Sequence, residues 1–342
     1  MLLIKKIKRA IRTLIHVHAR SSEPAIRILF HVRRIWRVIR KLFLARRIGP
    51  AIKKLTNARK IELLEEHFRN GLPAGLRPGL EYLTTGITDE IATLAADEAE
   101  ARRAVIASEG EKKVSIWYSP KPGSAGEEVQ ENLKPSPGKV IEFTMQRVAL
   151  TGKHEKWGTV LHYLIRGFQC ERGIELGSCA GISALYLSSA PSLKKLITVE
   201  GSTELSKIAE ISLKDRPQVK VVNSLFDEAI DNEILSESER FDFAYIDGHH
   251  EKVATIHYFN RLAPCLKEGA LVIFDDVSWS YDMRDAWDNL SERTEFSHAI
   301  DLGTIGICVM NSNSNQLSPP KRWNLQPITG VCSIGDPLGW KE

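Results

Sequence analysis

The sequence has no apolar run of about 18 residues, the length that a helix needs to cross a bilayer. Its five cysteines are widely spaced and include no Cys-x-x-Cys pair, which argues against a zinc ribbon and a disulfide framework and favours a reducing compartment. The segment from Thr13 to Ala19 is too short and too rich in histidine for a secretory signal. We therefore expect a cytoplasmic protein that does not cross a membrane by itself.

Acidic residues are almost absent from the first 60 positions, where 18 Lys and Arg accompany the single acid Glu23. The rest of the chain carries 29 Lys and Arg against 42 Asp and Glu. The hydrophobic periodicity predicts amphipathic helices over residues 2–18 and 26–48, and in the second the apolar and basic side chains fall on opposite faces.

Several partners suit such a basic amphipathic segment. Residues 1–48 can lie on an anionic membrane surface, which would make the protein peripherally membrane-associated. Alternatively, the apolar stripe packs on the catalytic domain or on a second subunit, as in a homodimer. An organelle transit peptide has a similar composition. Nucleic acid is the least favoured partner, because no recognised binding module or aromatic stacking platform accompanies the charge.

The length of 342 residues suggests two domains, or one large domain with an extension. The composition divides the chain into basic amphipathic helices (1–60), a helical cap with a linker rich in Pro and Gly (61–140), a ligand-binding domain (141–311) and a loop-like tail (312–342). Within the cap, Thr88 and Asp89 precede a helix expected from Glu90 to Ser108. We expect a domain boundary near residue 140.

Beyond residue 140, short apolar strands alternate with helices, a pattern that predicts βαβ units and a doubly wound α/β fold with a parallel sheet. The expected strands are 173–177, 196–200, 219–223, 241–247 and 270–275. The next two, 297–302 and 305–310, are separated only by Gly303 and Thr304, so they must pair as an antiparallel hairpin that closes the sheet.

The first of these strands ends in the sequence ELGSCAGIS, which runs from Glu175 into a helix. Gly177 permits a sharp turn, and Gly181 permits a close approach of the backbone to a ligand. The helix that follows begins here, and its N-terminus favours an anionic group. Cys179 replaces the middle glycine of the dinucleotide fingerprint, so a ligand carrying a carboxylate suits the loop better than a pyrophosphate. Glu200 ends the next strand, where doubly wound folds place the acid that binds ribose hydroxyls.

Residues 144–310 resemble the class I S-adenosylmethionine (SAM)-dependent methyltransferases. ELGSCAGIS is similar to the SAM loop of catechol and caffeoyl-CoA O-methyltransferases, and VEG (199–201) to their ribose-binding turn. IDGH (246–249) and FDDVSWS (274–280) are similar to the IDGxH and FDDxxWS motifs of a bacterial methyltransferase family. The resemblance implies a Rossmann-like methyltransferase sheet with a closing antiparallel hairpin, here preceded by an N-terminal helical extension.

The resemblance also implies where the cofactor lies. Gly177 and Ser178 would line the methionine half of SAM, Ser183 would bind its carboxylate and Glu200 its ribose. Asp247 would lie near the sulfonium. The full set of expected cofactor-binding residues is Glu175, Gly177, Ser178, Gly181, Ser183, Glu200, Gly201, Leu225, Phe226 and Asp227, the last three at the adenine edge.

Three carboxylates end the fourth and fifth strands, at the sheet edge where ligands of such folds bind. Asp247, Asp275 and Asp276 are spaced like the metal-binding acids of the catechol-type enzymes, and we expect them to hold Mg²⁺ or another divalent cation. Asp276 and His250 stand where the catechol-type pattern has Asn and Lys. His249 and His250 are the candidate general bases, and with Asp247 they form the expected catalytic group.

The sequence therefore predicts a class I methyltransferase that methylates an oxygen of a small-molecule, glycan or lipid-linked acceptor. Trp279, Tyr281 and Trp287 either form a wall for a flat acceptor or pack in the core. Two other functions remain open at this point. One is a nicotinamide-dependent oxidoreductase, and the other is a non-catalytic SAM-binding scaffold at a membrane.

Overall fold

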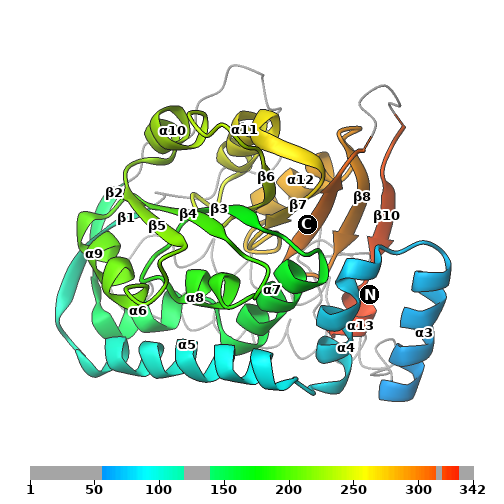
Figure 1. Cartoon of the computed structure of the whole chain (residues 1–342), viewed down its shortest axis with the longest axis horizontal. Helices are drawn as coiled ribbons and strands as arrows, with labels where there is room; N and C mark the ends of the chain where they lie inside the picture. Colours follow the sequence, from blue (N-terminus) through cyan, green and yellow to red (C-terminus); the bar gives the residue numbers. More distant parts are fainter. Residues whose placement is uncertain (1–55, 119–138, 313–317, 331–342) are drawn as a thin grey trace, which may run out of the picture. The chain divides into compact units, whose positions relative to one another are not determined.

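The computed structural model describes residues 56–118, 139–312 and 318–330 (Figure 1). Leu55–Glu342 form one compact unit. The helices expected at 2–18 and 26–48 lie outside the described residues. The segments on both sides of residue 140, where we expected a domain boundary, belong to this same unit.

The larger unit is built around an eight-stranded sheet with the strand order β10-β8-β9-β7-β6-β3-β4-β5. Each expected strand is present within a few residues of its predicted bounds. The strands are β3 (Arg172–Leu176), β4 (Lys195–Glu200), β5 (Val219–Asn223), β6 (Phe241–Ile246), β7 (Leu266–Phe274), β8 (Phe296–Asp301), β9 (Gly306–Met310) and β10 (Lys321–Asn324). In this sheet only β9 runs antiparallel to its neighbours, β7 and β8, so the predicted closing hairpin is confirmed.

The order of the strands reverses at β3, which pairs in parallel with β4 on one side and with β6 on the other. In such sheets, the crevice beyond the carboxyl ends of the strands at this point is where ligands bind. The backbone continues the pairing past the strand ends, since Asp247 N donates to Leu176 O at 2.9 Å. The segments that follow β3 and β6 are therefore held side by side.

Helices cover both faces of the sheet. Figure 1 shows α10 and α11 on one face and α8, α7 and α5 on the other. The helices of this part of the chain are α6 (Met145–Thr151), α7 (Glu155–Gly167), α8 (Ile182–Ser188), α9 (Thr203–Ser212), α10 (Phe226–Ala229), α11 (Lys252–Leu262) and α12 (Tyr281–Leu290). This arrangement is the doubly wound α/β fold predicted from the sequence.

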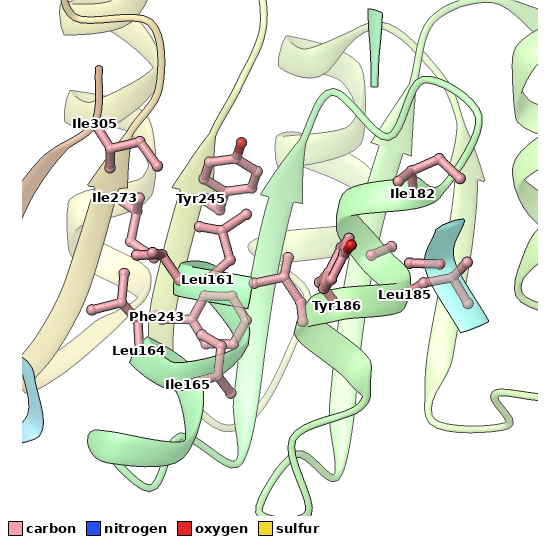
Figure 2. Packing of buried hydrophobic residues seen from close by; sticks show 14 of the residues in the cluster. Leu161, Leu164, Ile165, Ile182, Leu185, Tyr186, Phe243, Tyr245, Ile273 and Ile305 are labelled. Carbon is pink, nitrogen blue, oxygen red and sulfur yellow. The ribbon is translucent and has the colours of Figure 1, made fainter. Parts of the chain in front are cut away.

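The central strands are apolar along their whole length because both of their faces are buried. In β7, Leu271 and Ile273 belong to the hydrophobic cluster beneath α7 and α8, whereas Val272 and Phe274 belong to the cluster beneath α11 and α12. Figure 2 shows the first cluster, in which Tyr245 and other sheet residues meet side chains from α7 and α8.

The region before the sheet is helical, as expected, but it also contains a two-stranded ribbon. Its helices are α3 (Asn57–Arg69), α4 (Arg77–Thr85) and α5 (Glu90–Ser108), and Asp89 caps α5 by accepting from Ala92 N at 2.9 Å. The strands β1 (Lys113–Tyr118) and β2 (Lys139–Thr144) pair antiparallel. We did not predict them, since their pairing spans the Pro- and Gly-rich segment.

The segment after β9 differs from the loop-like tail that we expected at 312–342. Lys321–Asn324 form β10, which pairs in parallel with β8, and Gln326–Thr329 form the short helix α13. Trp323 is the only buried residue of β10, so the sequence shows no apolar alternation there. Within the described ranges, no helix combines the length and apolar character that a membrane span requires.

Candidate active site

The glycine loop between β3 and α8 has the tight geometry that its sequence predicts. Gly177 has a φ of 106°, and a methyl group at its Cα would overlap the carbonyl oxygen of Asp247. Gly181, at the N-terminus of α8, has a φ of 83°. Both positions therefore require glycine, and the loop lies directly against the end of β6.

Glu200 binds the glycine loop from the end of β4. Its carboxylate accepts from Cys179 N at 2.8 Å and from Ser202 N at 2.8 Å, and the N–H of Gly201 also favours its charged form. Burial nevertheless raises its pKa to about 7. Each carboxylate oxygen has a second lone pair, so Glu200 can fix the loop and still accept a hydrogen bond from a ribose hydroxyl.

Glu175 forms a buried polar network beneath the loop. Its Oε2 accepts from the Thr198 hydroxyl, which also bonds Ser178, while Ser183 lies beside it in the first turn of α8. Burial raises the pKa of Glu175 to about 7. Its Oε1 is buried and has no hydrogen-bond partner among the described residues.

The expected adenine edge is only partly available to a ligand. Leu225 is exposed, and the Phe226 ring packs edge-on against Tyr258 with 5.2 Å between ring centroids. Asp227, in contrast, accepts from His257 and Arg261 of α11, both at 2.8 Å. Both contacts are made by Oδ1, and the place of Asp227 at the adenine edge stays a prediction.

The three acids that follow β6 and β7 have different surroundings, and their side chains do not all face the crevice. Asp275 is buried, with Oδ2 bound to the Tyr245 hydroxyl and to Lys153 and Oδ1 accepting from Asp276 N at 2.7 Å. Although burial disfavours its charged form, the ion pair with Lys153 holds the pKa of Asp275 below its usual value. Burial and the Asp275 charge raise the pKa of Asp247.

A different trio faces the crevice. The side chains of Asp247, His250 and Asp276 each place one ligand atom within 4.8 Å of the other two. His250 Nε2 lies 4.0 Å from Asp247 Oδ1 and 3.8 Å from Asp276 Oδ2. Within the described residues it is His250, not Asp275, that forms this trio with two of the expected metal ligands, Asp247 and Asp276. Two carboxylates and one imidazole on one side suit a divalent cation, with the remaining positions open.

The two candidate bases have different surroundings. His249 has a φ of 57°, and its Nδ1 lies 3.1 Å from the Tyr258 hydroxyl. His250 faces the carboxylates and packs near Trp279, with 6.1 Å between ring centroids. The geometry therefore places His250, rather than His249, in the acidic cluster.

Of the three aromatic residues near the acids, two are accessible. Trp279 is 54% exposed and Tyr281 is 39% exposed, so both are available to an acceptor. Trp287 is buried in the cluster beneath α12, where it packs against Phe274. For Trp287, the interpretation as a core residue is correct.

Lys153 is the residue of this site that the sequence analysis missed. It lies between α6 and α7, about 120 positions before its partner in the chain, and its side chain is only 11% exposed. No motif surrounds it. The only signal is indirect: a fully buried aspartate requires a cation, and the sequence does not say which one.

Comparison with known proteins gives a family for the centre of the chain. Residues 174–277 match the family model described as a methyltransferase domain. Among curated proteins, none matches the sequence. Similar solved structures include the O-methyltransferase TomG from Streptomyces achromogenes in complex with SAM (18% identity, 47% of this chain and 82% of that chain, TM-score 0.41). The O-methyltransferase from Bacillus cereus in complex with SAH is also similar (19%, 48% and 88%, TM-score 0.41).

The matched segment contains the glycine loop, Glu200 and all three acids. A parallel sheet that reverses at its first strand and closes with an antiparallel strand is the class I methyltransferase architecture. The chain therefore contains a methyltransferase domain over residues 174–277, within a sheet of this architecture. This match favours a methyltransferase over the nicotinamide oxidoreductase that the sequence left open.

Proposed function

We propose that the protein transfers the methyl group of SAM to an oxygen of its acceptor, with a divalent cation held by Asp247, His250 and Asp276. The observation that carries this proposal is the position of that trio. It lies at the carboxyl end of β6 and β7, and Gly177 of the glycine loop contacts Asp247. Cofactor and cation would therefore lie next to each other.

Each residue of the site has a defined task in this proposal. Glu175 receives the ammonium of the methionine half, and Glu200 accepts from the ribose while it fixes the loop. A bound cation would acidify an acceptor hydroxyl and orient it for in-line attack on the methyl group. Trp279 offers a flat apolar surface beside His250, on which the acceptor can rest. The acceptor class stays as predicted: a small molecule, a glycan or a lipid-linked molecule.

Titration with Mn²⁺, followed by the loss of its free EPR signal, tests the cation site directly. We expect the wild-type protein to bind Mn²⁺ and the Asp276→Asn variant to bind it about tenfold more weakly, because an amide oxygen carries no charge. Asp231→Asn, on the surface at Arg261, is the matched control and should bind like the wild type.

Calorimetric titration with SAM, in the presence of Mn²⁺ and of EDTA, accompanies this experiment. SAM binding without any Mn²⁺ binding would overturn the metal part of the proposal and leave His250 as a general base. Absence of SAM binding would contradict the proposed cofactor site. SAM binding without turnover on any acceptor class would favour the scaffold function.

We also propose that the basic segment at residues 1–48 binds the protein to anionic lipid membranes. Charge reversal at Arg33, Arg34, Arg37 and Arg40 is expected to weaken binding to phosphatidylserine-containing vesicles at least tenfold, since each basic residue near such a surface contributes about 1 kcal/mol. Co-sedimentation measures the effect, with pure phosphatidylcholine vesicles as the control. Failure of the wild-type protein to sediment with anionic vesicles would contradict the proposal.

A further inference from the structure

Lys153 is a buried cation in a cluster of acids, and it comes from outside the segment that matches the methyltransferase family. It forms an ion pair with Asp275, and the carboxylates of Asp247 and Asp276 also favour its charged form. The cluster therefore combines three carboxyl groups with one ammonium.

The backbone around Lys153 is fixed by Arg103 of α5. The Arg103 guanidinium donates to Ala149 O at 2.5 Å, to Gly152 O at 3.1 Å and to Lys153 O. Glu100, one turn earlier, binds Arg103 at 2.7 Å and also accepts from the Tyr186 hydroxyl of α8 at 3.0 Å. The position of the ammonium is thus set by helices packed beneath the sheet.

The ion pair decides which oxygens of the acids face the crevice. Asp275 uses Oδ2 for Lys153 and Tyr245, and it uses Oδ1 for the backbone of Asp276. Asp247 uses Oδ2 for the Tyr245 hydroxyl at 2.8 Å, and its Oδ1 is the atom that lies near His250. The contacts with Lys153 and Tyr245 therefore keep the Asp275 carboxylate away from the crevice. Asp247, in contrast, directs its Oδ1 towards His250.

We propose that Lys153 is a positioning residue that keeps Asp275 out of the ligand set, so that the site offers two carboxylates and an imidazole instead of three carboxylates. This inference rests on the proposed metal-assisted function. Its chemical consequence is a preference for cations that accept nitrogen ligands, such as Mn²⁺, over Mg²⁺, which favours oxygen. Replacement of Lys153 would release a third carboxylate and shift that preference towards Mg²⁺.

The test compares Mg²⁺ and Mn²⁺ affinities of the full chain and its Lys153→Met variant by calorimetry. We expect the variant to bind Mg²⁺ about tenfold more tightly than the wild type, with a smaller change for Mn²⁺. Lys153→Arg keeps the charge and should behave like the wild type. Lys194→Met, which removes an exposed lysine paired with Glu171, controls for the loss of a charge elsewhere.

The double variant Lys153→Met, Asp275→Asn separates positioning from simple loss of charge. If the freed carboxylate causes the gain, the double variant returns to the Mg²⁺ affinity of the wild type. A gain that persists in the double variant, or no gain in a Lys153→Met protein that still binds SAM, would overturn the inference.

Crystal structures of the metal-free wild type and of the Lys153→Met variant distinguish this inference from the proposed function. Rotation of Asp275 towards Asp247 and Asp276 in the variant supports the positioning role even if the wild type binds no cation, in which case only the proposed function fails. An Asp275 that stays in place in the variant overturns the positioning role, whatever the wild type binds.

Discussion

Replacement of Gly177 by alanine is expected to weaken SAM binding on the order of 100-fold. Two costs combine at this position. The φ of 106° is unfavourable for any residue with a Cβ, and the added methyl group would overlap the carbonyl oxygen of Asp247. Backbone strain and the shift needed to relieve the overlap together cost about 3 kcal/mol, which corresponds to that loss of affinity.

Calorimetric titration with SAM measures the effect, and Gly86→Ala is the matched control. Gly86 also has a positive φ, 74°, but no atom lies within 4 Å of the position that its Cβ would take. It ends α4, away from the loop, so its replacement should cost only the strain, about 1 kcal/mol of unfolding free energy, and leave SAM affinity unchanged. Equal SAM affinity in Gly177→Ala and wild type would show that the loop does not contact the cofactor.

The free energy of unfolding of the wild type, relative to that of Glu175→Gln, is expected to fall by about 3 kcal/mol between pH 4.5 and pH 7. Burial raises the pKa of Glu175 in the folded protein from 4.5 to about 7. In this window the folded state keeps a proton that the unfolded state has lost, so this contribution to stability falls as the pH rises. Above pH 7 both states are ionised, and the difference becomes constant.

Urea unfolding of both proteins at several pH values from 4.5 to 8 gives the difference curve. Other groups titrate in the same range, Glu200 among them, and subtraction of the two curves cancels their shared contribution. Glu233→Gln, which removes a carboxylate near the surface at Lys220, is the control for loss of a carboxylate elsewhere. A flat curve for Glu175→Gln would mean that Glu175 is ionised throughout, and so is better solvated than its burial indicates.

The sequence predicts the sheet well because local patterns determine it. The strands of the centre are buried on both faces and therefore appear as short apolar runs, and the two-residue connection at Gly303 leaves the hairpin no alternative pairing. The same holds for α5, whose cap at Asp89 is visible in the sequence. The ribbon of β1 and β2 and the strand β10 depend on partners distant in the chain, and no local pattern identifies them.

The site shows the same division between local and distant contributions. Residues that the turn itself positions, such as Gly177 and Glu200, are where the motifs place them. Contacts with a distant partner were missed: Arg261 binds Asp227, and Lys153 binds Asp275. Burial of a charge demands a partner, but the sequence does not show which residue the fold will supply.

The contact between β10, α13 and the first helices of the described unit has a consequence for synthesis on the ribosome. Trp323 packs edge-on against His67 of α3, and Lys321 donates to the carbonyl of Asn70, about 250 positions earlier in the chain. The part of α3 and α4 that these residues cover therefore stays exposed until residues 321–329 have emerged from the exit tunnel. Contacts of such long range slow folding and expose nascent chains to chaperones, so completion of this unit is delayed until residues 321–329 have been translated.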